Sequence, residues 1–414
     1  MKNNFLGSLL VTISLSTCLG ACQMNSGLIK ENELADGGNN LMEVDNRSIS
    51  LSYPSQNQTI TILKPAVLKY ILAMKEQAKG IENDYVFNNL NGDHVKIADY
   101  YRAASVDEKS KRIPLIFDAK GFASNQTFTV SISTNPDVSN AKQYGTTDSF
   151  VTVDNLYANT TYYWQVSSGD IKSEINSFTT DGYTRMISAD YVANIRDMGG
   201  HPVAGGKHIK QGLIFRGGEL VYTQYKDGSS THSKTLSDRA IEILVDDLGI
   251  GMEVDFRGAS EANNATESDL GDDIEYRRYS IGGYGGVITS SSHYAELKEL
   301  FTAFANAESK HVYFHCWGGA DRTGTIGFLL GGLLGMSYTD LVIDYELTSF
   351  SKNLRPHDSK GEYWDFPGLI SALKNANYWE EGKSISDTIK TWMMDKLQMT
   401  EQEVEAIKTN LLED

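Results

Sequence analysis

The stretch His315-Cys316-Trp317-Gly318-Gly319-Ala320-Asp321-Arg322-Thr323-Gly324 decides how the chain around it is expected to fold. A short buried strand is expected before it at Val312–Phe314, and a helix after it at Thr323–Met336. That helix is apolar on all sides, which is typical of a buried helix. A strand, a glycine-rich loop and a helix N-terminus favour an anion, because loop N–H groups and the helix dipole attract negative charge. The stretch therefore predicts an anion-binding loop.

Two side chains in this loop suit chemistry at phosphorus. A thiol at such a position ionises more readily than that of a free cysteine, so Cys316 is the expected nucleophile. Arg322 carries a planar guanidinium that can bind two phosphate oxygens. A leaving oxygen also needs a proton, normally from a carboxylic acid. The candidates are Asp321 inside the loop and, as alternatives, Asp255 and Asp197. Asp321 could instead only pair with Arg322 and shape the loop.

The other loop residues have supporting roles in this interpretation. His315 is expected to orient the loop through a ring N–H, and the Thr323 hydroxyl to donate to the sulfur. Trp317 either walls the pocket, where it would stack on an aromatic ring, or packs against the sheet. A second glycine-rich segment, Gly282–Gly286, is flexible enough to cover the site, although an ordinary surface loop fits equally well. The residues expected to line the substrate site are His315, Trp317, Gly318, Gly319, Ala320 and Thr323.

The same stretch matches the pattern H-C-x-x-G-x-x-R-[ST]-G at all six fixed positions. It thereby resembles the cysteine-dependent phosphatases, the superfamily of tyrosine and dual-specificity phosphatases. The segment Asn194-Ile195-Arg196-Asp197-Met198-Gly199-Gly200 resembles the N-x-R-D-x-G-G motif of the bacterial atypical branch, which includes secreted tyrosine and lipid phosphatases. Arg216-Gly217-Gly218 and Glu253-Val254-Asp255-Phe256-Arg257 resemble further elements of that branch, so the likeness spans about 184–414.

This resemblance implies a reaction and a substrate-binding set. It implies that a phosphomonoester is hydrolysed through a phosphocysteine intermediate, without a metal or other cofactor, and that Asp321 is the general acid. It further implies that Asn194, Arg196 and Asp197 border the phosphate loop. A sulfurtransferase or arsenate reductase also uses a cysteine–arginine loop, but Gly319 and the pair Thr323-Gly324 argue against both.

The residue before the loop aspartate bears on the substrate. Family members that hydrolyse phosphoinositides usually carry lysine there, whereas this chain has Ala320. Without that cation a second phosphate loses a partner. Phosphotyrosine-like monoesters, on a protein or a small molecule, are therefore the expected substrates. Phosphoinositides or inositol phosphates on the same site are one alternative. An inactive surface lipoprotein that binds phosphate esters is the other.

The rest of the chain predicts a multidomain protein. Helical and strand segments alternate over 184–414, which indicates an α/β phosphatase domain with a mainly parallel central sheet flanked by helices. Residues 97–181 show short alternating strands separated by turns, which is typical of a β-sandwich. Tyr162 and Trp164 there resemble the tyrosine corner and the core tryptophan of a fibronectin type III domain. Residues 48–96 suggest a strand and a helix but no function.

The N-terminus resembles an export signal. Lys2 precedes a mostly apolar run, and Leu19-Gly20-Ala21-Cys22 resembles a bacterial lipobox. Residues 1–21 are therefore the expected signal peptide, Cys22 the lipid-bearing residue and residues 22–47 a linker. The expected location is the cell surface or periplasm, with a lipid anchor in a bacterial membrane. An ordinary signal peptide or an uncleaved anchor is the alternative.

The composition of the chain excludes several other classes of protein and of partner. The 414 residues allow two or three domains, and 40% hydrophobic with 22% charged residues exclude a wholly disordered chain. Lys and Arg number 37 and Asp and Glu 54, which gives a net charge of −17. Such a charge repels nucleic acid, so a nucleic-acid partner is not expected. Three cysteines are too few for a disulfide framework.

Overall fold

The computed structural model describes residues 45–79, 95, 97–100, 109–190, 192–220, 222–226, 229–233, 236–351, 366–379 and 382–414. The predicted signal peptide, Cys22 and nearly all of the predicted linker lie outside these residues. Within the described part of the chain, no helix combines the length and the apolar character that a bilayer crossing requires.

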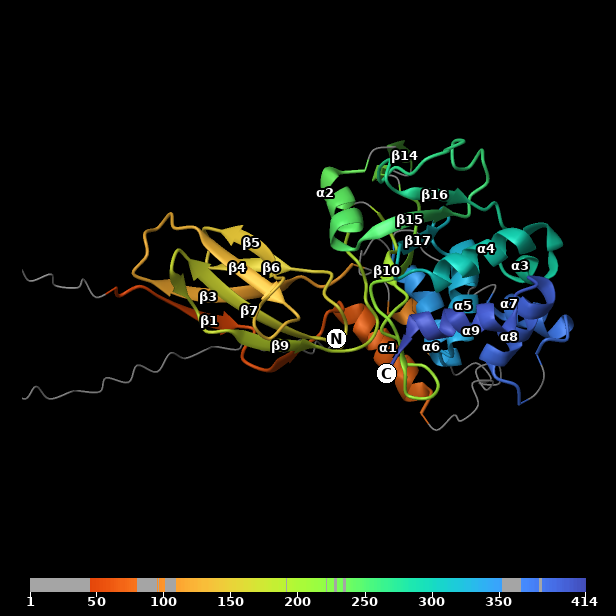
Figure 1. Cartoon of the computed structure of the whole chain (residues 1–414), viewed down its shortest axis with the longest axis horizontal. Coiled ribbons are helices and arrows are strands. Elements are labelled where there is room, and N and C mark those ends of the chain that lie inside the picture. The colour runs from red at the N-terminus through yellow and green to blue at the C-terminus, as the bar shows by residue number, and fades with distance from the viewer. Residues whose placement is uncertain are drawn as a thin grey trace, which may run out of the picture. The chain divides into compact units, whose positions relative to one another are not determined.

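Residues 48–180 contain two β-sheets that share one hydrophobic cluster (Figure 1). The first is antiparallel and has the order β1-β3-β6: β1 (Ser48–Tyr53), β3 (Ile113–Lys120) and β6 (Phe150–Val153). The second has the order β2-β9-β7-β4-β5, with β8 beside β7: β2 (Gln58–Ile60), β4 (Phe128–Ser133), β5 (Lys142–Thr146), β7 (Thr161–Ser168), β8 (Ile171–Lys172) and β9 (Asn176–Thr180). All its pairs are antiparallel except β2 with β9.

Alternation along β7 explains how the shared cluster forms. Tyr162, Trp164 and Val166 are buried while their neighbours are less so, because successive strand residues point to opposite faces. The Tyr162 hydroxyl accepts a hydrogen bond of 2.7 Å from the N–H of Tyr157. A buried hydroxyl needs such a partner.

The segment 48–96, to which the sequence gave no function, is divided between two cores. Strands β1 and β2 belong to the two sheets just described, which therefore begin before residue 97, where the sequence analysis placed their start. Helix α1 (Pro65–Gln77) buries Val67, Tyr70, Ile71 and Met74 in the larger cluster of the α/β region. The helix was predicted from its spacing. The pairing of β1 with β3 and of β2 with β9 joins strands far apart in the chain, and it leaves no local pattern in the sequence.

The α/β region has a five-stranded sheet with the order β10-β12-β17-β15-β16. The four strands β12, β17, β15 and β16 are parallel and β10 is antiparallel, so the sheet is mainly parallel, as predicted. Its strands are β10 (Arg196–Asp197), β12 (Ile214–Gly217), β15 (Ile250–Asp255), β16 (Glu275–Arg278) and β17 (His311–His315). Two further strand pairs are β11 (His208–Ile209) with β18 (Leu412–Glu413) and β13 (Tyr222–Lys226) with β14 (Ser229–Ser233).

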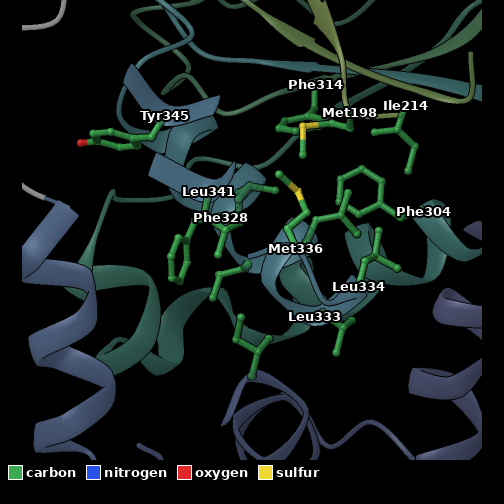
Figure 2. Close-up of a cluster of buried hydrophobic side chains, with 14 of the residues drawn as sticks. Met198, Ile214, Phe304, Phe314, Phe328, Leu333, Leu334, Met336, Leu341 and Tyr345 are labelled. Atoms are coloured by element: carbon green, nitrogen blue, oxygen red, sulfur yellow. The ribbon is translucent and has the colours of Figure 1, made fainter. Parts of the chain in front are cut away.

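Helices cover both faces of this sheet. Val312 and Phe314 of β17 enter the larger cluster, whereas Tyr313 between them enters a smaller one with residues of α2 and η3. Figure 2 shows Phe314 and Ile214 of the sheet near Phe304 of α4. The helices are η2 (Ile97–Asp99), α2 (Asp238–Ile241), η3 (Glu242–Asp247), α3 (Gly285–Thr289), η4 (Ser291–His293), α4 (Tyr294–Ala305), α5 (Arg322–Leu334), α6 (Tyr338–Glu346), η5 (Leu347–Phe350), α7 (Phe366–Asn375), α8 (Ile385–Lys396) and α9 (Glu401–Leu411).

Candidate active site

The predicted strand, loop and helix are present as β17, residues 316–321 and α5. Cys316 directly follows β17 and is a free, buried cysteine, 2% exposed. Trp317 is 41% exposed, and Asp321 is exposed as well, so these two side chains reach the surface at the loop. Helix α5 is buried on every face beyond its first residue, Arg322, as its composition predicts.

Four successive carbonyl groups of the loop are bound by the surrounding protein. A carbonyl group and the N–H of the next residue point in opposite directions across a trans peptide bond. Each carbonyl oxygen lies 3.0–3.1 Å from the nitrogen atom that hydrogen-bonds to it. The Cys316 carbonyl pairs with His315 Nδ1, and the Trp317 carbonyl accepts from the Glu219 N–H. The Gly318 carbonyl accepts from Asn194 Nδ2, and the Gly319 carbonyl accepts from Arg216 Nη2.

The loop N–H groups consequently face away from these partners. Within the described residues, the N–H groups of Trp317, Gly318 and Gly319 donate to no protein acceptor. A run of backbone donors turned to one side, next to a helix N-terminus, binds an anion. The loop therefore has the geometry of a phosphate cradle, with the Cys316 sulfur at its start.

Two glycines allow the cradle to form. Gly319 has φ +70°, and a Cβ there would lie 2.4 Å from the backbone of Gly217 in β12. Gly327 lies in α5, where a Cβ would come within 2.5 Å of Arg216 Nη1. A side chain at either position would push the loop, or the arginine that binds it, out of place.

A buried frame of charges stands behind Asn194 and Arg216. Arg196 Nη1 donates to Asn194 Oδ1 at 2.7 Å, and its Nε donates to Asp344 Oδ1 at 2.6 Å. Arg216 Nη1 donates to the other oxygen of Asp344. Burial alone would raise the pKa of Asp344, but Arg196 and Arg216 hold that pKa well below its usual range. Asn194 thus touches the loop, as predicted, and Arg196 lies one contact behind it.

Asp197 has a different position from its neighbours in the motif. It pairs with Arg185 at 2.9 Å and accepts hydrogen bonds from the N–H groups of Gly199 and Gly212. Its carboxylate is fully buried. These contacts make it part of a turn, and they leave it unsuited to the role of proton donor that the sequence left open.

Asp255, the other alternative acid, is held in its ionised form. It lies at the end of β15, fully buried, and accepts hydrogen bonds from Arg257 and from the Tyr276 hydroxyl. Burial would raise the pKa of Asp255, but the charges of His315 and Arg257 outweigh it and lower the pKa to about 2. A carboxyl group that stays ionised to such low pH cannot protonate a leaving group at neutral pH.

His315 links this charge network to the loop. Burial would lower the pKa of His315, but Asp255 and Glu253 outweigh it and raise the pKa above its usual value. Its Nε2 lies 2.8 Å from Glu253 Oε1, and its Nδ1 faces the Cys316 carbonyl. The predicted orienting role agrees with this geometry, and the raised pKa favours the protonated form of the ring, whose charge would lie beside Cys316.

Arg322 is held by a glutamate that the sequence analysis did not identify. Its two terminal nitrogens donate to Glu261 at 2.8 and 2.6 Å, and Nη1 also donates to the Phe256 carbonyl at 3.0 Å. This pairing raises the pKa of Arg322 and outweighs the opposite effect of burial. Arg322 Nε donates to no acceptor among the described residues, so this donor remains for a ligand.

The predicted hydrogen bond from Thr323 to the sulfur is not made. The Thr323 hydroxyl is fully buried and has no hydrogen-bond partner within the described part of the chain. Cys316 is placed by the end of β17, whereas Thr323 belongs to the first turn of α5, so nothing draws the two side chains together.

The sequence analysis missed several residues around the loop because they lie on other segments. Glu261 follows β15, and the carboxyl ends of β15 and β17 lie side by side in the parallel sheet. This adjacency is the one feature of the sequence-based fold that could have indicated Glu261. Tyr284 lies in the glycine-rich segment that was singled out only for its flexibility. Glu253 was quoted as part of a motif but given no role. The residues missed are Glu219, Glu261, Tyr284, Asp344 and Tyr345.

Comparison with known proteins agrees with this geometry. Residues 187–413, just over half of the chain, match the model of the "Tyrosine phosphatase family". A protein of Cupriavidus necator named as a tyrosine-protein phosphatase is 25% identical over 187 residues, 38% of this chain and 61% of that protein. A tyrosine-protein phosphatase of Nostoc commune is 28% identical over 131 residues, 27% of this chain and 45% of that protein. The chain thus covers less than two thirds of either relative.

Proposed function

Because the chain belongs to the tyrosine phosphatase family, we propose that it hydrolyses phosphomonoesters at the loop between Cys316 and Arg322. The hydrogen bonds to four successive loop carbonyls carry this proposal, since they turn the loop N–H groups to the opposite side, where these groups could bind one anion. Preorganised donors of this kind stabilise the charge that develops on transferred phosphoryl oxygens.

The proposed mechanism has two steps. The Cys316 thiolate attacks phosphorus, the bond from phosphorus to the ester oxygen breaks, and Asp321 gives that oxygen its proton. Water then attacks the phosphocysteine, gives a proton to Asp321, and releases phosphate and the thiolate. Arg322 and the loop N–H groups bind the phosphoryl oxygens in both steps. No step requires a metal or other cofactor.

The substrate class follows from the side chains at the loop. Ala320 supplies no cation for a second phosphate, and the exposed Trp317 offers a flat apolar surface beside the loop. Monoesters with an aromatic leaving group, such as phosphotyrosine in a protein or peptide, fit this surface best. Phosphoinositides on the same site remain the alternative substrates, and a panel of phosphotyrosine, phosphoserine and phosphoinositides separates these classes.

The experiment that tests this function uses the full chain and p-nitrophenyl phosphate. Turnover is expected to continue with EDTA present, and Cys316→Ser is expected to lower it by about a thousandfold or more. Unchanged melting of the variant would show that the fold is intact. Full turnover by Cys316→Ser, or abolition by EDTA, would contradict the mechanism. Phosphate-ester binding without turnover in the unsubstituted chain would favour a non-catalytic binding protein.

We also propose a module and an anchor outside the catalytic region. Residues 113–180, together with β1 and β2, are proposed to form a fibronectin type III-like β-sandwich, supported by the two sheets with one core and by the bond to the Tyr162 hydroxyl. Residues 1–21 are proposed to be a signal peptide and Cys22 a lipid-bearing residue that places the protein at a bacterial membrane, outside the cytoplasm. Mass spectrometry of the mature N-terminus tests the anchor, and an unmodified Cys22 would refute it.

A further inference from the structure

The segment Gly282–Gly286 lies against the start of α5. A Cβ on Gly283 would lie 3.7 Å from the Arg322 nitrogen and 3.8 Å from the Asp321 Cβ. Between its glycines, Tyr284 has φ +54° and ψ −133°, a conformation that residues other than glycine rarely adopt. Such a backbone is strained and persists only where contacts hold it.

Contacts hold Tyr284 through both its backbone and its side chain. Its N–H donates to Thr325 Oγ1 at 2.8 Å, and that hydroxyl donates to the Asp321 carbonyl at 2.9 Å. The Tyr284 hydroxyl donates to Asp321 Oδ1. The strained residue is therefore tied to the backbone and to the carboxyl group of one residue, the proposed general acid.

A second tyrosine holds the first. The Tyr345 hydroxyl donates to the Tyr284 oxygen at 3.2 Å. Tyr345 is 2% exposed, and Figure 2 shows its ring at the edge of the apolar cluster with the hydroxyl directed away from it. It belongs to α6, where its neighbour Asp344 holds Arg216 behind the phosphate loop. One helix thus supports both the loop and the contact to the acid.

Helix α5 does not orient the Asp321 side chain by capping. The residue is the N-cap of α5, yet its side chain accepts no capping hydrogen bond from the helix. Proton transfer is fastest when the carboxyl group is held in one orientation, so a contact that holds it bears on the rate.

We propose that Tyr284 is a positioning residue for the general acid, an inference that rests on the proposed function. By holding Oδ1 of Asp321, it directs Oδ2 toward the ester oxygen that leaves phosphorus. In the first step the proton passes from Oδ2 to that oxygen. In the second step Oδ2 accepts a proton from the attacking water. The strained backbone fixes the tyrosine in this place, which a flexible glycine segment alone would not do.

The test compares two leaving groups on the full chain. Phenyl phosphate has a poor leaving group and needs the acid, whereas p-nitrophenyl phosphate has a good one and needs it far less. General acids contribute about 10²–10⁴-fold, of which positioning is a part. Tyr284→Phe is therefore expected to lower kcat/KM about tenfold for phenyl phosphate and less than about threefold for p-nitrophenyl phosphate. In an Asp321→Asn background the same change is expected to add nothing.

Tyr294→Phe is the matched control, since its hydroxyl donates to the Ile288 carbonyl and does not touch Asp321. It is expected to affect both substrates alike. If Tyr284→Phe lowers kcat/KM equally for both substrates, or not at all, the positioning role is overturned. The proposed function is untouched by that result as long as turnover of p-nitrophenyl phosphate depends on Cys316. Absence of that turnover in the unsubstituted chain would instead overturn the proposed function, and this inference with it.

Discussion

The two sides of the site are held in different ways. On the phosphate side, Asn194, Arg196, Arg216 and Asp344 are at most 4% exposed and form a continuous set of buried hydrogen bonds. On the acid side, Asp321 is exposed and accepts a hydrogen bond from the Tyr284 hydroxyl. Buried charge networks specify one geometry, whereas exposed contacts are weaker. The contrast is between an anion cradle held by buried charges and a proposed proton donor held by exposed contacts.

The largest expected effect comes from the phosphate side. Asp344→Asn leaves Arg196 and Arg216 buried without their anionic partner, and such a loss costs roughly 3–5 kcal/mol. Urea denaturation would measure it as a lower free energy of unfolding. Asp321→Asn, on the exposed side, is the control and is expected to cost less than about 1 kcal/mol. Equal losses of unfolding free energy in the two variants would mean that the phosphate side and the acid side contribute equally to stability.

The next effect concerns the charge network under the loop and depends on pH. The pKa of Asp255 is lowered from 3.8 to about 2, so its ionised form stabilises the fold above pH 4, and this contribution is lost as pH falls through 2. Asp255→Asn is expected to lower the free energy of unfolding by about 2 kcal/mol at pH 7.

Denaturation curves at several pH values check this second prediction. The difference between the two proteins is expected to narrow as the pH falls from 4 toward 2. A difference of the same size across that window would show that the carboxylate contributes through packing and not through its charge.

The smallest effect concerns Glu261, which is on the exposed side of the site. Glu261→Gln keeps the shape but removes the charge that orients Arg322, so kcat/KM for p-nitrophenyl phosphate is expected to fall about tenfold. The free energy of unfolding is expected to change little, because the pair is partly exposed. Lys310→Gln, which breaks an exposed pair with Glu275 at the sheet edge, is the control for both measurements. A rise in kcat/KM would mean that Glu261 competes with substrate for the guanidinium.

The parts of the site that one continuous stretch of residues determines could be predicted from the sequence. Cys316, Arg322 and the strand and helix around them follow from one stretch, because strand, loop and helix N-terminus are local structures. Asn194 came from a second motif and does touch the loop. The residues that hold this stretch come from distant segments. Glu261 and Tyr284 contact it directly, and Asp344 holds Arg216, which binds it, only after the sheet and α6 have assembled.

Two misjudged features have the same origin. Thr323 was assigned a bond to the sulfur on the basis of closeness in sequence, but Cys316 follows the end of β17 and Thr323 lies in the first turn of α5. The strands β1 and β2 were not assigned to the sheets of residues 113–180, because their partners lie far along the chain. In each case the deciding contact is tertiary, and no local pattern encodes it.

The central claim is that phosphate is transferred to the Cys316 sulfur, and trapping the intermediate tests it most directly. The Asp321→Asn variant, mixed with p-nitrophenyl phosphate and quenched in acid within the first turnover, should retain the phosphoryl group because hydrolysis of the intermediate is slowed. Peptide mass spectrometry is expected to find the mass of one phosphoryl group on the peptide that contains Cys316. Phosphoryl transfer to a different residue, or turnover with no phosphorylated peptide, would contradict the account.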